Sequence, residues 1–336
     1  MISLNLGTNN GLYLDEPLDT WLTASQHDYA VPEAAGSSAR VFLLKGNINQ
    51  LALQKNPAIK IMRHDKLAYA QPLFKQELLI LNALSDLSTI TPILLTGFLQ
   101  TGEGVIWPGE IAPLTKSTQL ASSGHGVKGE MVLFNPNETE LMLEEFDQRL
   151  KEHWLPFLLL EHRWEDNLYV LTDAGYSRGE FSKNLSMRQV LKASIQIVQS
   201  LATAHEKGII YLDHKLLHYY WNDVRQQVMI IDWNIGRFLE DKITPELKQF
   251  DLLQFSARAL HHLFTGRQAP GSVAIGPNRP EDIENSPRHF KASYPYDVQK
   301  RLNQDEMVFL EKALDGFFDS AGEMSDALEL LLKKRL

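Results

Sequence analysis

The chain has 336 residues, a formal net charge of -9 and no cysteine. The negative charge argues against non-specific nucleic-acid binding, which needs a basic surface, and the absence of cysteine excludes disulfides and thiol chemistry. The N-terminus lacks the basic start and apolar run of a signal peptide, and no apolar run reaches the roughly 18 residues of a membrane span, so we expect a cytoplasmic protein that binds neither membrane nor nucleic acid.

A polar segment precedes the first β-type run. Residues 1–28 are polar and mixed, and we interpret them as an N-terminal extension. The small residues around Gly36 then lead into a β run that contains Val41. A turn of small residues lets backbone N–H groups approach phosphate oxygens, because nothing bulky intervenes. This turn is therefore a candidate phosphate contact, with an ordinary hairpin turn as the alternative.

A lysine interrupts the apolar strand that we predict over residues 57–62. Lys60 needs a partner or a ligand there, because a buried, unpaired ammonium group is costly. A helix predicted over residues 73–84 carries Glu77 among apolar residues. We expect this carboxylate to pair with Lys60; the alternative is that both residues lie on the surface and are unrelated.

An insertion follows this helix. A strand is predicted over residues 93–100 and a buried strand over residues 155–163. Residues from about 103 to 152 separate the two strands and contain an acidic stretch, 138–153, with apolar residues at helical spacing. We predict a helix for this stretch.

A further amphipathic helix precedes the stretch around which the chain is organised. Its apolar spacing predicts a helix over residues 187–205, and Gly208 is placed to end it. Two apolar and aromatic runs follow, 218–221 and 228–231. The polar connector between them predicts a β-hairpin.

This hairpin is expected to bring charged residues together. In an antiparallel pair, the start of the first strand and the end of the second lie side by side. Asp213 and Lys215 come just before the first strand, and Asp232 comes just after the second. Two carboxylates with different neighbours can serve as a base and as a metal ligand. The alternative is a buried hairpin whose flanking charges are merely solvated.

The C-terminal part is predicted to be mostly helical. Residues 308–332 have an apolar pattern with helical spacing, and residues 251–266 are expected to be helical from the family resemblance given below. Residues 267–300, which lie between them, are rich in proline and glycine and are predicted to be a loop.

The order of these features resembles that of the protein kinases. The run Y-L-D-H-K that ends at Lys215 stands where the family has H-R-D-x-K, and the run I-D-W-N that contains Asp232 stands where it has D-F-G. The A-I-K that ends at Lys60 is similar to the family's V-A-I-K, and the helix that begins at Asp251 resembles its helix αF. The resemblance covers residues from about 29 to 336.

This resemblance implies an α+β, bilobal, protein-kinase-like fold. A β-rich N-lobe would comprise residues 29–163, with the insertion at about 103–152, and a mostly helical C-lobe would comprise residues 164–336. The subgroup that the chain resembles is the bacterial Ser/Thr protein kinases. The implied function is transfer of the γ-phosphate of ATP to a protein hydroxyl.

The resemblance also implies roles for the charged residues. Asp213 would take the proton of the acceptor hydroxyl, and Lys215 would steady the γ-phosphate. Lys60, oriented by Glu77, would hold the α- and β-phosphates of ATP. These roles agree with the chemistry of phosphoryl transfer, which needs positioning and cations over the phosphates rather than covalent work.

Metal and nucleotide contacts are implied in the same way. Asp232 would bind Mg²⁺, with Mn²⁺ as the alternative, and His218 stands where the family has the asparagine that binds a second metal ion. Asp251 would accept hydrogen bonds from the backbone of the loop that carries Asp213, and so fix it. The remaining candidates for contact with the nucleotide are Gly36, Val41, Ala58, Glu161, Arg163 and Tyr220.

Departures from the family pattern leave three functions open. Imidazole at His218 is a poorer magnesium ligand than an amide oxygen. Tyr211 and Leu212 replace the His and Arg of H-R-D, and the short segment 234–246 leaves little loop to cradle a peptide. The hypotheses are an active, atypical Ser/Thr protein kinase, a pseudokinase that binds nucleotide or a partner protein as a scaffold, and a small-molecule phosphotransferase. ATP and an unidentified protein are the expected partners.

Overall fold

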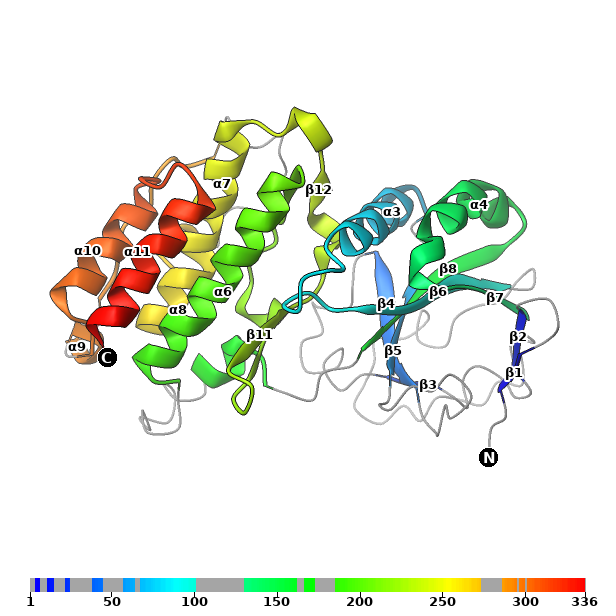
Figure 1. The fold of residues 1–336 in the computed structure, drawn as a ribbon, viewed down its shortest axis with the longest axis horizontal. Helices are drawn as coiled ribbons and strands as arrows, with labels where there is room; N and C mark the ends of the chain where they lie inside the picture. Colours follow the sequence, from blue (N-terminus) through cyan, green and yellow to red (C-terminus); the bar gives the residue numbers. More distant parts are fainter. Residues whose placement is uncertain are drawn as a thin grey trace. The chain divides into compact units, whose positions relative to one another are not determined.

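The computed structural model shows an α+β chain that divides into two units (Figure 1). Unit 1 comprises Met1–Asn82 and Pro92–His162, and unit 2 comprises Ala83–Thr91 and Arg163–Leu336. The described residues are 4–6, 11–14, 22–24, 38–44, 57–63, 67–100, 130–161, 166–172, 185–272, 286–294, 296–299 and 301–335.

An eight-stranded antiparallel sheet forms the described β-structure of unit 1, in the order β1-β2-β7-β6-β8-β5-β4-β3. The strands predicted over residues 57–62 and 93–100 are confirmed as β5 and β6. The strands are β1 (Leu4–Leu6), β2 (Gly11–Leu14), β3 (Leu22–Ala24), β4 (Ala39–Leu44), β5 (Pro57–Met62), β6 (Ile93–Gln100), β7 (Glu130–Phe134) and β8 (Trp154–Glu161).

Segments predicted as an extension and an insertion contribute strands to this sheet. Strands β1, β2 and β3 belong to the predicted N-terminal extension, yet they pair at the two edges of the sheet. Strand β7 belongs to the predicted insertion and pairs with β2 and β6. Sequence patterns did not reveal these strands, because runs this short show no clear period.

Two helices, α3 (Leu67–Ala83) and α4 (Thr139–Lys151), lie on one face of the sheet (Figure 1). Helix α3 begins six residues earlier than the predicted 73–84, because buried Ala70 extends its apolar stripe toward the N-terminus. Helix α4 confirms the helix predicted inside the insertion. A 3-10 turn, Pro136–Glu138, leads into it.

Unit 2 is mostly helical in its described part. Helix α6 (Met187–Glu206) confirms the helix predicted over 187–205, and Ser186 caps it by accepting a hydrogen bond from the Gln189 backbone N–H. Gly208 follows with a φ of 74°, and a Cβ at this position would clash with the backbone of Glu240. The other helices are α7 (Pro245–Phe255), α8 (His261–Thr265), α9 (Tyr296–Gln299), α10 (Gln304–Leu314) and α11 (Ala321–Lys334).

Predictions for the C-terminal helices need one correction. A π-helical turn, Ser256–Leu260, joins α7 to α8, so the helix predicted over 251–266 is continuous. The single helix predicted over 308–332 is wrong, because the chain forms α10 and α11 instead. Gly316, with a φ of 66°, interrupts the helical path. The Ser320 hydroxyl then starts α11 by accepting a hydrogen bond from the Glu323 N–H.

Two small antiparallel pairs complete unit 2. Strand β10 (Tyr219–Asn222) pairs with β11 (Gln227–Ile230), which confirms the predicted hairpin. Strand β9 (Ile209–Ile210) pairs with β12 (Arg237–Phe238). The loop that precedes β10 and the residue that follows β11 therefore lie at the same end of the hairpin.

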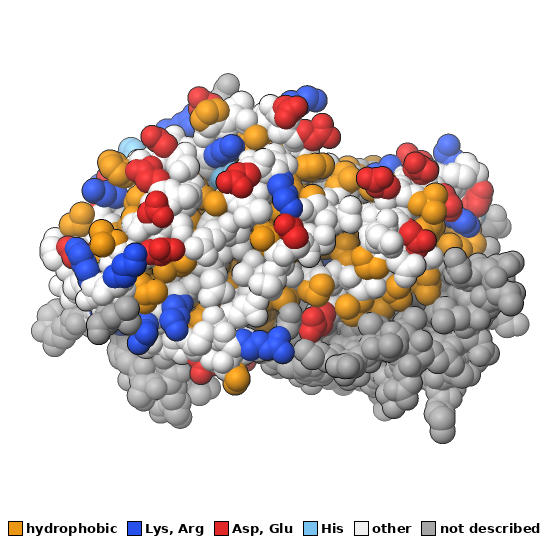
Figure 2. Space-filling view, viewed as in Figure 1, with side chains coloured by type: hydrophobic (Ala, Val, Ile, Leu, Met, Phe, Trp, Pro, Cys, Tyr) orange, Lys and Arg blue, Asp and Glu red, His pale blue; other side chains and the backbone are white. Residues whose placement is uncertain are grey.

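The surface has a mixed charge. On the face drawn in Figure 2, Lys and Arg side chains are interspersed with Asp and Glu side chains over the described elements. No described helix is both long enough and apolar enough to cross a membrane.

Candidate functional site

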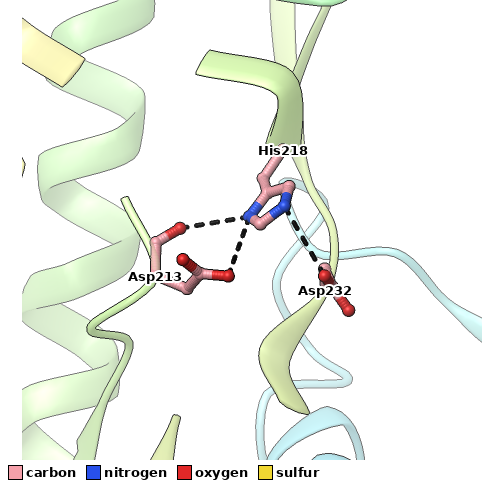
Figure 3. Close-up of side chains that lie close together, drawn as sticks. All are labelled: Asp213, His218 and Asp232. Carbon is pink, nitrogen blue, oxygen red and sulfur yellow. Dashed lines mark hydrogen bonds and ion pairs between the residues drawn. The ribbon is translucent and has the colours of Figure 1, made fainter. Parts of the chain in front are cut away.

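The loop before β10 and the residue after β11 bring three ionisable side chains together. Asp213 lies on the loop, His218 ends a 3-10 turn, Leu216–His218, and Asp232 follows β11 (Figure 3). One ligand atom from each of these residues lies within 4.8 Å of the other two. The hairpin thus joins the two carboxylates that the sequence predicted to meet.

Buried Asp251, in α7, fixes the backbone of this loop. Its Oδ2 accepts a hydrogen bond from the Tyr211 N–H at 3.1 Å, and its Oδ1 accepts one from the Leu212 N–H at 2.7 Å. This confirms the contact predicted for it. Two imidazoles also reach the carboxylate: His205 Nε2 lies 2.9 Å from Oδ2, and His214 Nε2 lies 2.9 Å from Oδ1. Four nitrogen atoms therefore surround one carboxylate.

These neighbours keep Asp251 ionised. Burial by itself raises the pKa of a carboxyl group, because it disfavours the charged form. Here the neighbouring His214 and the hydrogen bonds from His205 and His214 outweigh burial, and they hold the pKa of Asp251 well below its usual range. The charged carboxylate can accept hydrogen bonds from all four nitrogen atoms, which a neutral acid could not do.

Two residues of the site have a left-handed backbone conformation. Leu212, with a φ of 66°, lies at the centre of a γ-turn in which the Asp213 N–H donates to the Tyr211 carbonyl oxygen at 2.8 Å. Asp232 has a φ of 59°. Each such conformation costs about 1–3 kcal/mol and persists only where surrounding contacts enforce it. The hydrogen bond from Leu212 to Asp251 is such a contact.

The hydrogen bonds of His218 assign its tautomer. Tyr211 Oη donates its proton to the Ile231 carbonyl oxygen at 2.8 Å, so it can only accept from His218 Nδ1, which lies 3.1 Å away. Nδ1 also lies 3.1 Å from the carbonyl oxygen of Asp213, which is itself an acceptor. Nδ1 therefore carries the proton. The other ring nitrogen, Nε2, faces Asp232, whose Oδ2 is 3.5 Å away (Figure 3).

Burial keeps the two supporting tyrosines protonated. It raises the pKa of Tyr211 well above the usual value, and Tyr219 and the nearby carboxylates add to this effect. Burial raises the pKa of Tyr219 in the same way. Tyr211 thus remains the hydroxyl donor that the His218 tautomer requires. Tyr219 lies 2.8 Å from His214 Nδ1 and can donate to it while Nε2 donates to Asp251.

The donor set of the cluster suits a divalent cation. A neutral imidazole with its proton on Nδ1 offers the Nε2 lone pair, so Nε2 and Asp232 Oδ2, which face one another, could bind one cation together. Imidazole nitrogen together with carboxylate oxygen suits Mn²⁺ or Zn²⁺ better than Mg²⁺, which prefers oxygen ligands. Among the described residues, this cluster is the group of acidic and histidine side chains that could hold a metal ion.

Lys215 contacts the carboxylate of Asp213. Its Nζ lies 2.9 Å from Oδ1 and 3.0 Å from Oδ2, but its hydrogen bond is directed to Oδ2. Oδ1 accepts no hydrogen bond, so it keeps a lone pair that can take a proton. The side chain of Asp213 is 3% exposed and that of Lys215 is 43% exposed. The lysine can therefore turn away while the aspartate stays in place.

In unit 1 the predicted lysine–glutamate pair is present. Lys60 Nζ, in β5, donates to Glu77 Oε1, in α3, at 2.8 Å, and both side chains are buried. Val41 of β4 is the cross-strand partner of Lys60. Ala58 precedes Lys60 by two residues in β5, so Val41, Ala58 and Lys60 share one face of the sheet.

The structure describes two of the other predicted nucleotide contacts. Glu161 is the last residue of β8 and pairs with Pro57 at the start of β5. Tyr220 is half-buried in β10 of unit 2, where it pairs with Met229. Gly36 and Arg163 lie outside the described residues.

Sequence reasoning missed three side chains that build the site. The Tyr211 hydroxyl joins His218 to the end of β11, and His205 and His214 both contact Asp251. No local signal was available, because His214 lies between two charged residues, Asp213 and Lys215. The partner itself, Asp251, is 37 residues further along the chain than His214, so spacing could not identify it.

Comparison with known proteins assigns no family to the chain. No protein-family model matches it, and no curated protein matches its sequence. Its function is therefore inferred from its residues and their geometry.

Proposed function

We propose that the chain is an atypical Ser/Thr protein kinase, which transfers the γ-phosphate of ATP to a protein hydroxyl in the cytoplasm. Units 1 and 2 would be the N-lobe and the C-lobe of a bilobal, kinase-like fold. The observation that carries this proposal is the cluster of Asp213, His218 and Asp232 on a loop that Asp251 fixes. Phosphoryl transfer depends on positioned carboxylates and on cations at the phosphates, and the cluster provides the first and can bind the second.

Each charged residue has a role in this proposal. Asp213 would accept the proton of the substrate hydroxyl at Oδ1, the oxygen without a hydrogen bond. Lys215 would turn from Asp213 to the γ-phosphate, since its side chain is partly exposed. In unit 1, Lys60 would bind the α- and β-phosphates while Glu77 keeps it oriented. A divalent cation held by Asp232 and His218 would neutralise phosphate charge.

A pseudokinase, which would bind nucleotide or a partner protein as a scaffold, is the second candidate. The contacts of Asp213 favour it, because Lys215 already pairs with the carboxylate and His218 Nδ1 lies 3.7 Å from Oδ2. Lys215 therefore competes with a substrate hydroxyl for the carboxylate that would act as the base. Tight nucleotide binding without phosphoryl transfer to any protein would favour this candidate over the kinase.

Replacing both members of the buried pair tests the nucleotide site in unit 1. The double variant Lys60→Met/Glu77→Leu removes both charges, so its stability should stay within about 1 kcal/mol of the original protein. Its affinity for ATP should fall about tenfold or more, because a charge-assisted contact to phosphate is lost. The measurement is the rise in melting temperature on addition of ATP with Mg²⁺ or Mn²⁺, compared with the ligand-free form of each variant.

A matched variant controls for the loss of an ion pair as such. Lys334→Met/Asp305→Leu removes an exposed pair in which Nζ lies 2.7 Å from Oδ2. This variant should keep the full nucleotide-induced stabilisation. Equal stabilisation in both double variants would show that Lys60 does not bind nucleotide, and the proposed role would be rejected.

His218→Asn is expected to change the metal preference of the cluster. Asparagine supplies an amide oxygen in place of the Nε2 lone pair, and oxygen ligands favour Mg²⁺ over Mn²⁺ or Zn²⁺. We expect the ratio of Mn²⁺ to Mg²⁺ affinity to fall about tenfold. Titration calorimetry with each metal, and Mn²⁺ electron paramagnetic resonance, would measure this ratio without an activity assay.

The same substitution at an exposed histidine provides the control. His289 is exposed, and His289→Asn should leave both metal affinities unchanged. If His218→Asn also leaves the ratio unchanged, the imidazole does not ligate the cation, and its place in the metal site is wrong.

A further inference from the structure

Helix α4, which belongs to the predicted insertion, packs against helix α3 in unit 1 (Figure 1). Phe146 of α4 and Phe74 of α3 are both fully buried, and their ring centroids lie 6.4 Å apart. Phe146 also meets Phe98 of β6 at a centroid distance of 6.0 Å. One buried ring of the insertion therefore joins α3 to the sheet.

Asp147, the next residue of α4, adds polar contacts to the same helix. Its Oδ1 accepts hydrogen bonds from Gln71 Nε2 and Lys75 Nζ, each at 2.7 Å. The hydrogen bond from Lys75 lowers the pKa of Asp147. Lys75 Nζ also lies 4.9 Å from the centre of the Phe146 ring, within range of a cation–π contact. Gln71 and Lys75 are one turn apart, so Asp147 opposes movement of α3 along its axis.

Helix α4 is itself held to the sheet at both ends. Strand β7 precedes it and pairs with β6, and Asn135 and Glu138 form a capping box at the start of the helical segment. In the last turn of the helix, Arg149 lies 5.0 Å from the ring of Trp154, the first residue of β8. A helix supported in this way can act as a fixed surface for α3.

The contacts with α4 lie close to Glu77 on α3. Phe74 and Lys75 precede Glu77 by less than one turn, and Glu77 Oε1 accepts the hydrogen bond from Lys60. A helix moves as a rigid body over such a short distance, because its backbone hydrogen bonds connect successive turns. A shift or rotation of α3 that broke its contacts with α4 would therefore also move Glu77 relative to Lys60.

We propose that Phe146 and Asp147 are positioning residues for the Lys60–Glu77 pair: α4 holds α3 in the register that keeps Glu77 on Lys60. The expected change in nucleotide affinity rests on the proposed kinase function. The expected change in amide hydrogen exchange of α3 does not, because it can be measured without nucleotide.

The test reverses the charge at Asp147, which is largely exposed and not part of the core. Asp147→Lys places a second lysine next to Lys75. Repulsion between two exposed like charges shifts a local folding equilibrium by about fivefold. We expect amide hydrogen exchange in residues 67–83 to become about fivefold faster, and ATP affinity to fall by a similar factor. Glu144→Lys makes the same charge change at an exposed residue of α4 that contacts no described partner, and it should change neither quantity.

Two further variants distinguish an effect on the position of Glu77 from a general loss of structure. Lys75→Glu/Asp147→Lys restores an ion pair with reversed charges and should return both quantities most of the way to their original values. In a Glu77→Gln background, Asp147→Lys should produce no further loss of ATP affinity, because the group through which it acts has been removed. An equal further loss in that background would show that α4 has only a structural effect.

Failure of this proposal can be distinguished from failure of the proposed function. If Asp147→Lys leaves hydrogen exchange in α3 unchanged, α4 does not position α3, whatever the nucleotide affinity. If the original protein binds no nucleotide, the kinase proposal and the nucleotide-binding form of the pseudokinase proposal lose their support. Faster exchange in Asp147→Lys with rescue by the charge swap would still support the positioning of α3 by α4.

Discussion

Replacing Asp213 by asparagine is expected to reduce phosphoryl transfer about a thousandfold, because an amide cannot take the proton of the acceptor hydroxyl. The shapes of the two side chains are nearly the same, and the asparagine can still accept the hydrogen bond from Lys215. Nucleotide binding should therefore change little. The measurement is metal-dependent release of phosphate from ATP and autophosphorylation, followed with γ-labelled ATP and by intact mass.

The same change at an exposed aspartate is the control for this experiment. Asp241 is exposed at the surface of unit 2, and Asp241→Asn should retain full turnover. Turnover that persists in Asp213→Asn would reject Asp213 as the base. Tight nucleotide binding with no turnover in the original protein would instead favour the pseudokinase.

Replacing Asp251 by asparagine is expected to destabilise unit 2 by about 4 kcal/mol. The carboxylate accepts hydrogen bonds from the backbone of Tyr211 and Leu212 and contacts the rings of His205 and His214. Asparagine has one acceptor oxygen, and its NH₂ group would face donors. Some of these buried N–H groups would then lack a partner. Urea denaturation followed by circular dichroism, with hydrogen exchange of residues 209–218, would measure the loss.

Lowering the pH should reduce the difference in the free energy of unfolding between the original protein and Asp251→Asn. The pKa of Asp251 is lowered in the folded protein, so between the folded and the unfolded pKa the unfolded chain binds more protons, and stability falls as pH falls. The stabilisation by Asp251 is complete above the ordinary carboxyl pKa of about 4 and is lost as the pH drops below it. The variant lacks this contribution at every pH.

Loss of the Asp251 contacts should also affect the loop itself. Leu212 keeps its left-handed φ of 66° next to the hydrogen bond that it donates to Asp251, so hydrogen exchange near Asp213 should increase more than in α10 or α11. Unchanged stability and exchange in Asp251→Asn would mean that the loop is held by other contacts. Asp241→Asn again supplies the comparison, with an expected change near zero.

Local patterns allowed much of the fold to be predicted. The helix α6 and the hairpin of β10 and β11 were predicted from apolar spacing and from a polar connector, because these signals arise within a few residues. The pairing of Lys60 with Glu77 was predicted because a lysine in an apolar strand requires a partner. Where the local signal was weak, as in the short edge strands and at Gly316 between α10 and α11, prediction failed.

By itself, the sequence determined which carboxylates meet: Asp213 and Asp232 flank the hairpin, and their meeting follows from antiparallel pairing alone. Only the tertiary structure decided how these groups are held. The proton position on His218 depends on the Tyr211 hydroxyl, and the fixed loop depends on His205, His214 and Asp251. The physical reason is that buried polar groups take partners from distant parts of the chain, and neither apolar periodicity nor motif spacing contains information about such contacts.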